Sequence, residues 1–534
     1  MALEANPQSA SSLRWPPEAR ALASLAGSWL RRSFGHDAGS EATAEMAPVA
    51  DPGALLEHAR VEGLAPVLHL ALRSNESMSR PLRARIAGDY YSAAVGNAVI
   101  SADLARILGE FKARSIPIIV LKGAFLVHAV YDNIAVRRMD DVDLLVERTK
   151  VPDAHRMLTE TFGMRSLQET DYTRPPEYSR FTNSAYYLPL RLASDRASSG
   201  TVPHPRADLA GTRVPASAES SAHSTSLREA VSCSVHLHWH LVNASYPLDF
   251  YVKRLDMDRI WRERCDYAYT VAGHPCPDTE AGWPAGPQSG EEQDRFLVPG
   301  LAPHHLLLHL CEHGLKHGFS ELRYLVDIGA ALMYITGDMK NLVSTEDSPS
   351  SHSELGSDSP CLRAKGMPRP WSGHDKNGHL SGKSNPGMSG PGLGPGLGST
   401  PDFWLARFAD DAKRFNLDRA AYFGLKFASV ALGLPLPAGL MERLEPPNRY
   451  GSELLLERLF CRGVRKVGLN WLAYSAMMRG WLERLSFVAG AFWPQADHRS
   501  MPPESRSPFL RNLRRLSRGI SGGLQVVGSM VGKG

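Results

Sequence analysis

Two aspartates separated by one residue lie within an apolar run, Asp141-Val-Asp-Leu-Leu-Val146. The run predicts a strand, and because side chains alternate along a strand, Asp141 and Asp143 are expected to point to the same side. The residues between them then point the other way, into a core. Two carboxylates held side by side repel each other unless a cation lies between them. The pattern therefore predicts a site for a hard divalent metal ion of the kind that assists phosphoryl chemistry.

A glycine turn precedes this strand. The β-branched run Ser115-Ile-Pro-Ile-Ile-Val-Leu121 predicts a buried strand, and residues 124–131 predict the start of a helix. Gly123 permits a tight turn and a close backbone approach, and amides that open a helix favour an anion. Lys122 could add a positive charge. Lys122 and Gly123 are thus predicted to contact phosphate, against the plainer interpretation of an ordinary turn carrying a surface lysine.

These segments resemble the bacterial uncharacterised nucleotidyltransferase family, part of the nucleotidyltransferase superfamily with a DNA polymerase beta-like core. The resemblance rests on Leu121-Lys122-Gly123, Tyr131, Arg137 and the strand from Asp141 to Val146. Weaker matches occur at residues 55–66, at His238-Trp239 and at residues 306–333.

The resemblance implies an α/β (α+β) fold with a mixed-sheet core, and Asp141 and Asp143 as catalytic residues that bind Mg²⁺ or Mn²⁺. It also implies an NTP substrate, with Lys122, Gly123 and Arg137 binding the nucleotide. For Arg137, a contact with the triphosphate and a local salt bridge are both open interpretations.

The third acid of the superfamily is replaced here, because the corresponding segment reads Val235-His-Leu-His-Trp-His240. His236 stands at the acidic position, so three interpretations follow. His236 could act as a catalytic base or ligand, an acid such as Asp249 could come from elsewhere, or catalysis could be lost while the fold remains. A zinc site on the alternating histidines would need further ligands.

Four more histidines, His305, His309, His313 and His317, recur every fourth residue and so lie along one helix face. They do not form a His-Glu-x-x-His motif. Packing against the sheet domain is the favoured interpretation, and a metal or nucleotide role is the alternative.

Composition indicates which partners and which cellular compartment the chain is expected to have. The 534 residues include 60 basic and 56 acidic ones, and a net charge of +4 gives no general indication of nucleic-acid binding. The six cysteines are scattered, which favours a reducing compartment over a disulfide framework. Neither a signal peptide nor a run of about 18 apolar residues is evident. The chain is therefore expected to be cytoplasmic.

The chain is expected to divide into helical and sheet regions interrupted by low-complexity segments. The predicted parts are an N-terminal helical subdomain (16–113), a nucleotidyltransferase-like core (114–270) with a disordered insertion (193–226), a helical pair packing on the core (300–337), a low-complexity linker (341–400), a C-terminal helical region (403–492) and a basic tail (493–534).

The predicted function is transfer of a nucleoside monophosphate from an NTP to an unidentified acceptor, which could be a protein, an RNA or a small molecule. Two alternatives share the fold: a catalytically impaired nucleotide-binding or scaffold protein, and an antitoxin-like partner protein. Members of the superfamily act on many different acceptors, so resemblance in fold does not identify the acceptor of this protein.

Overall fold

The computed structural model describes ten segments of the chain together with a few isolated residues. These are residues 3–4, 13–36, 51–168 (without 74, 76 and 77), 172–176, 183–189, 232–242, 254–270, 295–337, 400–447 and 451–463, with 339, 478 and 480–483.

A five-stranded mixed sheet carries the apolar run with the aspartates. Its strands are β2 (Ile118–Leu121), β3 (Val142–Val146), β4 (Arg165–Ser166), β5 (Ser184–Leu188) and β6 (Val235–His238). They lie in the order β2-β3-β6-β5-β4, with β3 and β6 parallel and the other pairs antiparallel. β2, β3 and β6 are buried along their whole length; β2 is entirely apolar, whereas β3 carries Asp143 and β6 carries His236 and His238.

A second, two-stranded sheet accompanies the first. It pairs β7 (Cys265–Thr270) with β8 (Arg295–Gly300) in antiparallel fashion, and β8 packs near β2. The sequence interpretation did not assign these strands, although it recognised the Pro/Gly-rich segment between them as a loop. A further short pairing joins β1 (Leu3–Glu4) to β9 (Leu436–Pro437).

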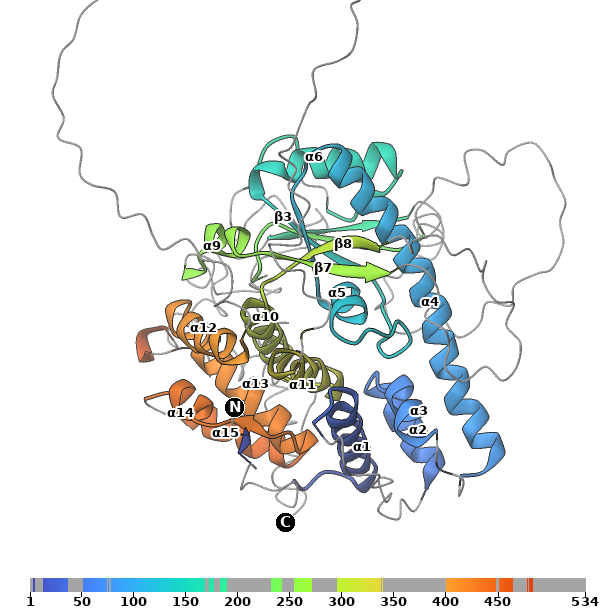
Figure 1. Ribbon diagram of the computed structural model, residues 1–534. Helices are drawn as coiled ribbons and strands as arrows, with labels where there is room; N and C mark the ends of the chain where they lie inside the picture. Colours follow the sequence, from blue (N-terminus) through green and yellow to red (C-terminus); the bar gives the residue numbers. More distant parts are fainter. Residues whose placement is uncertain are drawn as a thin grey trace, which may run out of the picture.

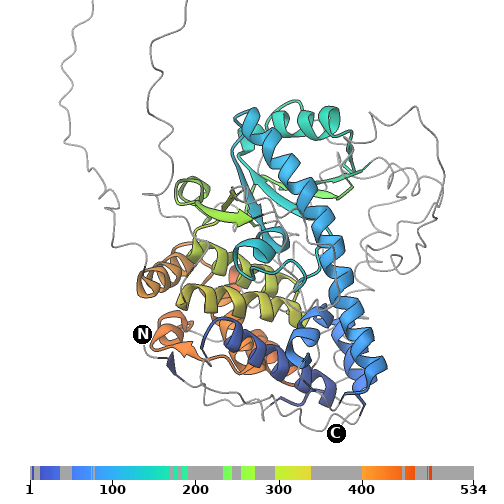
Figure 2. The ribbon, with the colours of Figure 1, turned by 45° about the vertical axis from the view of Figure 1, so that its right-hand side comes forward.

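The N-terminal helices begin where proline and capping signals predict. They are α1 (Pro17–Ser33), α2 (Pro52–Val61), α3 (Ala65–Leu72) and the long α4 (Arg80–Ala113). Asp51 caps α2, because its side chain accepts hydrogen bonds from the backbone amides of Gly53 and Ala54. In both ribbon views α4 runs along one side of the molecule, from the helices α2 and α3 up to the sheet (Figures 1 and 2).

Short helices surround the sheet. α5 (Lys122–Ala129) follows β2 directly, and after β3 come η2 (Arg148–Lys150), α6 (Val151–Arg156) and η3 (Met157–Thr161). α9 (Met257–Arg262) leads into β7. Gly163 ends the helical stretch after β3 with a φ of 62°, as a C-terminal glycine is expected to.

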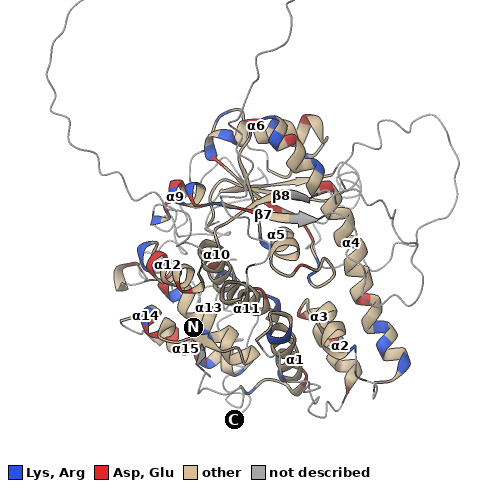
Figure 3. Ribbon diagram, in the orientation of Figure 1, with Lys and Arg blue, Asp and Glu red and all other residues tan. Residues whose placement is uncertain are grey.

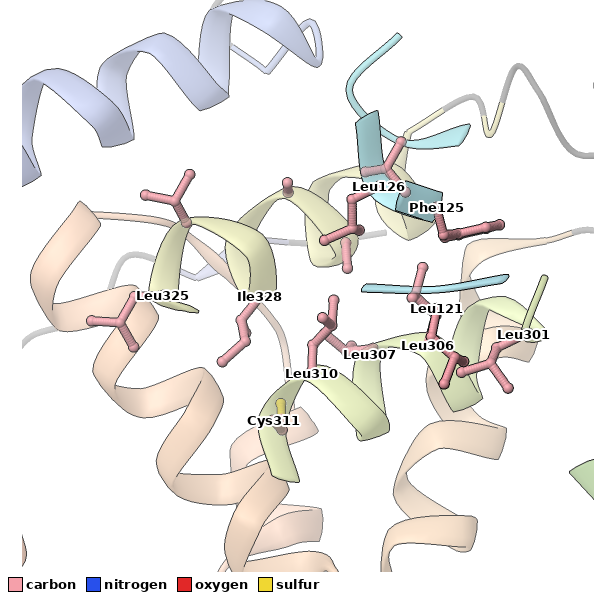
Figure 4. Packing of buried hydrophobic residues seen from close by; sticks show 14 of the residues in the cluster. Leu121, Phe125, Leu126, Leu301, Leu306, Leu307, Leu310, Cys311, Leu325 and Ile328 are labelled. Atoms are coloured by element: carbon pink, nitrogen blue, oxygen red, sulfur yellow. The ribbon is translucent and has the colours of Figure 1, made fainter. Parts of the chain in front are cut away.

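Two antiparallel helices, α10 (Pro303–Lys316) and α11 (Leu322–Thr336), lie between the sheet layer and the C-terminal helices (Figure 1). Figure 4 shows leucines of α10 facing Leu121, Phe125 and Leu126 of β2 and α5. All of these side chains belong to one continuous buried apolar cluster. The inner face of this helical pair packs against the elements that carry the glycine turn.

The C-terminal helices are α12 (Pro401–Arg414), α13 (Asp418–Leu432), α14 (Leu440–Leu444) and α15 (Gly451–Cys461). α13 packs on α10, α11 and α1. Gly27 permits the contact with α1, because a Cβ there would lie 1.7 Å from the Leu432 carbonyl oxygen. Figure 3 shows both charge signs interspersed on α12 and α14, which agrees with the small net charge.

The predicted fold class is confirmed: an α/β arrangement with a five-stranded mixed sheet and helices at both ends. Several predicted segments lie outside the described residues, namely the strand at 177–182, the insertion at 193–226, the linker from 341 to 399 and the basic tail at 493–534. Among the described residues, no helix combines the length and apolar character needed to cross a membrane.

Candidate functional site

Strand register brings the predicted site residues together. Asp143 is the register partner of His236 on the parallel strand β6 and of Leu121 on the antiparallel strand β2. Because Lys122 follows Leu121 directly, its side chain can reach the side of the sheet on which Asp143 and His236 lie. Tyr186 on β5 is in turn the register partner of His236. Four neighbouring strands thus supply one cluster of polar groups.

Asp143 lies at the centre of this cluster. Its Oδ1 atom accepts hydrogen bonds from Lys122 Nζ at 2.6 Å, His238 Nε2 at 2.8 Å and His236 Nδ1 at 3.1 Å. Burial alone would raise the pKa of Asp143, but the Lys122 charge and the two histidine hydrogen bonds hold that pKa well below its usual value. Asp143 is therefore a buried carboxylate that stays ionised.

The hydrogen bonds fix the tautomer of both histidines. An ionised carboxylate only accepts, so His236 Nδ1 and His238 Nε2 must carry the protons. Burial lowers the pKa of both rings and keeps them neutral. His236 Nε2, which lies 2.8 Å from Ser184 Oγ, then accepts from that hydroxyl. Both nitrogens of His236 are engaged, so the ring orients Asp143 in this arrangement.

Asp143 Oδ2 and the Asp141 carboxylate are the open groups of the site. Within the part of the chain that the structure describes, neither makes a hydrogen bond. Asp141 directly precedes β3 and is partly exposed. Burial and the neighbouring charge of Asp143 raise the pKa of Asp141 to about 7. Carboxylate oxygens are the ligands that Mg²⁺ prefers, so these two groups suit such an ion.

Ser184 and Tyr186 complete the cluster from β5. The Tyr186 ring stacks on His236, with ring centroids 3.7 Å apart and planes inclined by 14°. Sequence reasoning placed a strand at 186–190 but assigned these two residues no role. Their alternation, with a single residue between them, is the signal that could have placed them on one face.

Lys122 has an unusual backbone conformation. Its φ of 50° is left-handed, which is rare for a residue with a side chain. The turn aims the ammonium group at Asp143, with which it forms a largely buried ion pair. The structure therefore places Lys122 beside the acid pair.

Gly123 and Arg137 also lie in contact. A Cβ at position 123 would come within 2.1 Å of Arg137 Nη1, so only glycine leaves room for the guanidinium. Arg137 Nε lies 3.1 and 2.9 Å from the two carboxylate oxygens of Asp327, and Tyr131 donates to the same carboxylate at 2.8 Å. The structure thus places Arg137 in a buried ion pair with α11.

One face of α10 borders the cluster. The charge of Lys122 contributes to the pKa shifts of His309, Glu312, His313 and Lys316. Burial raises the pKa of Glu312 to about 7. For the histidines of this helix face the sequence favoured packing and left a metal or nucleotide role as the alternative; the structure places them near Lys122. Asp249, the other proposed source of a third acid, lies outside the described residues.

Comparison with known protein families gives a match that covers the residues of this site. The family model described as "Uncharacterised nucleotidyltransferase" matches residues 48–346, more than half of the chain. The match includes the glycine turn, the aspartate strand, the histidine strand and the helical pair. Neither the curated proteins nor the solved structures gave a match. On the evidence of the family model, the chain belongs to the uncharacterised nucleotidyltransferase family.

Proposed function

We propose that this protein transfers a nucleoside monophosphate from an NTP to an acceptor nucleophile, with Asp141 and Asp143 holding Mg²⁺ or Mn²⁺. The observation that carries the proposal is the pair of open carboxylate groups, Asp141 and Asp143 Oδ2, beside a lysine at a glycine turn. A divalent ion bound there would neutralise charge on the triphosphate and assist the attack of the nucleophile.

Asp143 is prepared for this role by its neighbours. The bonds from Lys122, His236 and His238 all converge on Oδ1, so they fix the carboxylate plane while Oδ2 remains available. A ligand held in one orientation binds metal ions better than a mobile one, because outer hydrogen bonds limit its motion. His236 is assigned as a positioning residue in place of the superfamily's third acid.

Lys122 has a second role in the proposal. In the absence of a cation it compensates the charge of Asp143. Its ammonium group carries three donors, so it can keep one bond to Asp143 and direct another toward a phosphate oxygen. Lys316 and His309 on α10 add polar groups near the same place. We expect the triphosphate to lie between the glycine turn and this helix face.

Label transfer tests the proposal. The protein is incubated with each NTP labelled at the α-phosphate, with Mg²⁺ or Mn²⁺, and with cell extract as the source of acceptor. We expect transfer by the wild type and a loss of at least about 100-fold in Asp141→Asn and Asp143→Asn. Asp140→Asn is the matched control, because Asp140 is adjacent but its side chain is 57% exposed and pairs loosely with Arg138 at 3.6 Å. Transfer that is equal in all four proteins would refute the assignment.

A specific observation favours a second candidate function. A histidine with both nitrogens engaged replaces the third acid, and a lysine already compensates Asp143. A protein that binds nucleotide without transferring it could be built in this way. Metal-dependent NTP binding that is lost in Asp141→Asn, together with no label transfer in any extract, would support this candidate over the enzyme.

A further inference from the structure

A second cluster of metal-ligating side chains lies where α9, α10 and α12 meet. Glu263 directly follows α9, His304 and His305 stand in the first turn of α10, and Asp411 lies on α12. One ligand atom from each lies within 4.8 Å of every other. The side chains of both histidines and of Asp411 are at most 1% exposed, and that of Glu263 is 20% exposed.

Four separations between these atoms are close to those between ligands of one metal ion. His304 Nε2 lies 3.2 Å from Glu263 Oε2 and 3.2 Å from Asp411 Oδ2. His305 Nε2 lies 3.7 and 3.1 Å from the same two oxygens. Two ligands bound to zinc at 2.0–2.1 Å in tetrahedral geometry are about 3.3 Å apart. The four nitrogen–oxygen separations are therefore in the range expected for ligand atoms that share one ion, and all four atoms lie within 4.8 Å of one another.

Each carboxylate turns its other oxygen to an arginine. Arg259 Nε lies 2.9 Å from Glu263 Oε1, and Arg259 Nη1 lies 2.7 Å from Asp411 Oδ1. Arg407 also pairs with Glu263 Oε1. Outer hydrogen bonds of this kind orient ligating carboxylates. The inner oxygens, Oε2 and Oδ2, are left to the histidines.

The two imidazoles are incompletely satisfied. Among the described residues, the Nδ1 atoms of His304 and His305 are buried and have no hydrogen-bond partner. Both rings instead direct Nε2 toward the same two oxygens, with their centroids 3.9 Å apart. Each Nε2 atom thus faces two carboxylate oxygens and is the ring nitrogen placed to take a metal ion, with the ring proton then on Nδ1.

We propose that Glu263, His304, His305 and Asp411 bind one Zn²⁺ ion that holds α9, α10 and α12 together. Two imidazole nitrogens and two carboxylate oxygens suit Zn²⁺, whereas Mg²⁺ prefers oxygen ligands in octahedral geometry. Four protein ligands and deep burial give a closed site, which is the form of structural zinc sites. Asp411 lies beyond the residues matched by the family model, so the ion would attach the C-terminal helices to the family region.

The rival arrangement is a metal-free network in which Arg259 and Arg407 neutralise the two carboxylates. The metal content of the purified protein distinguishes the zinc site from the metal-free network. The full-length protein is purified without a metal-binding tag, dialysed against Zn²⁺ and then against buffer, and measured by inductively coupled plasma mass spectrometry. We expect about one Zn²⁺ per wild-type chain and almost none in Asp411→Asn or in His305→Gln.

Two controls locate the ion. His309→Gln changes a buried histidine one turn further along α10 and should keep the zinc. His236→Gln changes the other His/Asp cluster, Asp143 with His236 and His238, and should keep it as well. Zinc lost in His236→Gln and kept in Asp411→Asn would place the ion at the aspartate strand and overturn the proposal. A wild type that retains no zinc would favour the metal-free network.

Two further readouts guard against a variant that fails to fold. Zn²⁺ should raise the thermal midpoint of the wild type and leave that of Asp411→Asn unchanged, because a ligand stabilises only the state that binds it. Co²⁺ added to apo wild type should give the visible absorption of a four-coordinate ion. An absent zinc-dependent midpoint shift, or the weak spectrum of six-coordinate Co²⁺, would contradict the closed site.

Discussion

The ion pair between Arg137 and Asp327 offers a quantitative test of the site's framework. The side chains are 13% and 5% exposed, and Arg137 Nε lies 2.9 Å from the nearer carboxylate oxygen. Replacing Asp327 by alanine leaves the guanidinium buried without its partner and removes the acceptor of the Tyr131 hydroxyl. Breaking a buried pair in this way costs about 3–5 kcal/mol in the free energy of unfolding.

Urea denaturation followed by tryptophan fluorescence measures this cost. We expect a large loss in Asp327→Ala and recovery of much of it in the double variant Arg137→Met/Asp327→Leu, because paired apolar side chains remove both buried charges. Arg138→Ala is the control: its pair with Asp140 is 57% exposed on both sides, so its loss should cost under about 1 kcal/mol.

Two outcomes would refute this reasoning. Asp327→Ala could be no less stable than Arg138→Ala, which would mean that the pair does not support the fold. Arg137→Met could leave stability unchanged and weaken NTP binding, which would return Arg137 to the nucleotide-binding role that the family resemblance implies. The structure favours a structural role for Arg137, which joins the glycine turn to α11.

Two further changes test the packing around the site. Burial raises the pKa of Glu312 from 4.5 to about 7. Between these two pH values the folded state binds the proton more tightly than the unfolded state. The free energy of unfolding therefore falls as pH rises through this range, by up to about 3 kcal/mol. The difference in unfolding free energy between the wild type and Glu312→Gln isolates this contribution, because the other titrating groups are common to both; it should shift by this amount between about pH 5 and about pH 8, and an unchanged difference would contradict the prediction. Gly123→Ala should lower the free energy of unfolding by about 1–3 kcal/mol, because the added Cβ meets Arg137. Gly109→Ala is the control: the position has open space around it, so this change should be neutral or stabilising. Equal effects of the two changes would refute the steric argument.

Local pattern predicts the parts of the site that lie within one element. Alternation predicts the same side for Asp141 and Asp143, although β3 itself begins at Val142, and it predicts one side for His236 and His238; strand pairing then makes His236 the register partner of Asp143. The helical pair from residue 303 to 336 was predictable from its apolar period. Each of these inferences needs only the geometry of a single element.

Contacts between distant segments could not be predicted in this way. Arg137 and Asp327 are 190 positions apart, and from the sequence alone Asp140 and a phosphate are equally good partners for Arg137. The β7–β8 hairpin was missed because its strands flank a long Pro/Gly-rich segment and lack a clear alternation. The cluster of Glu263, His304, His305 and Asp411 combines three helices that no spacing rule connects.

The central claim is that Asp141 and Asp143 together hold a divalent cation. Electron paramagnetic resonance of Mn²⁺, titrated into the zinc-loaded protein with and without NTP, measures this binding directly. We expect the wild type and Asp140→Asn to bind Mn²⁺ more tightly when NTP is present, and Asp141→Asn to lose at least about tenfold in affinity, the effect of about 1.4 kcal/mol. Identical Mn²⁺ titrations of Asp141→Asn and Asp140→Asn would show that the aspartate pair is not the cation site.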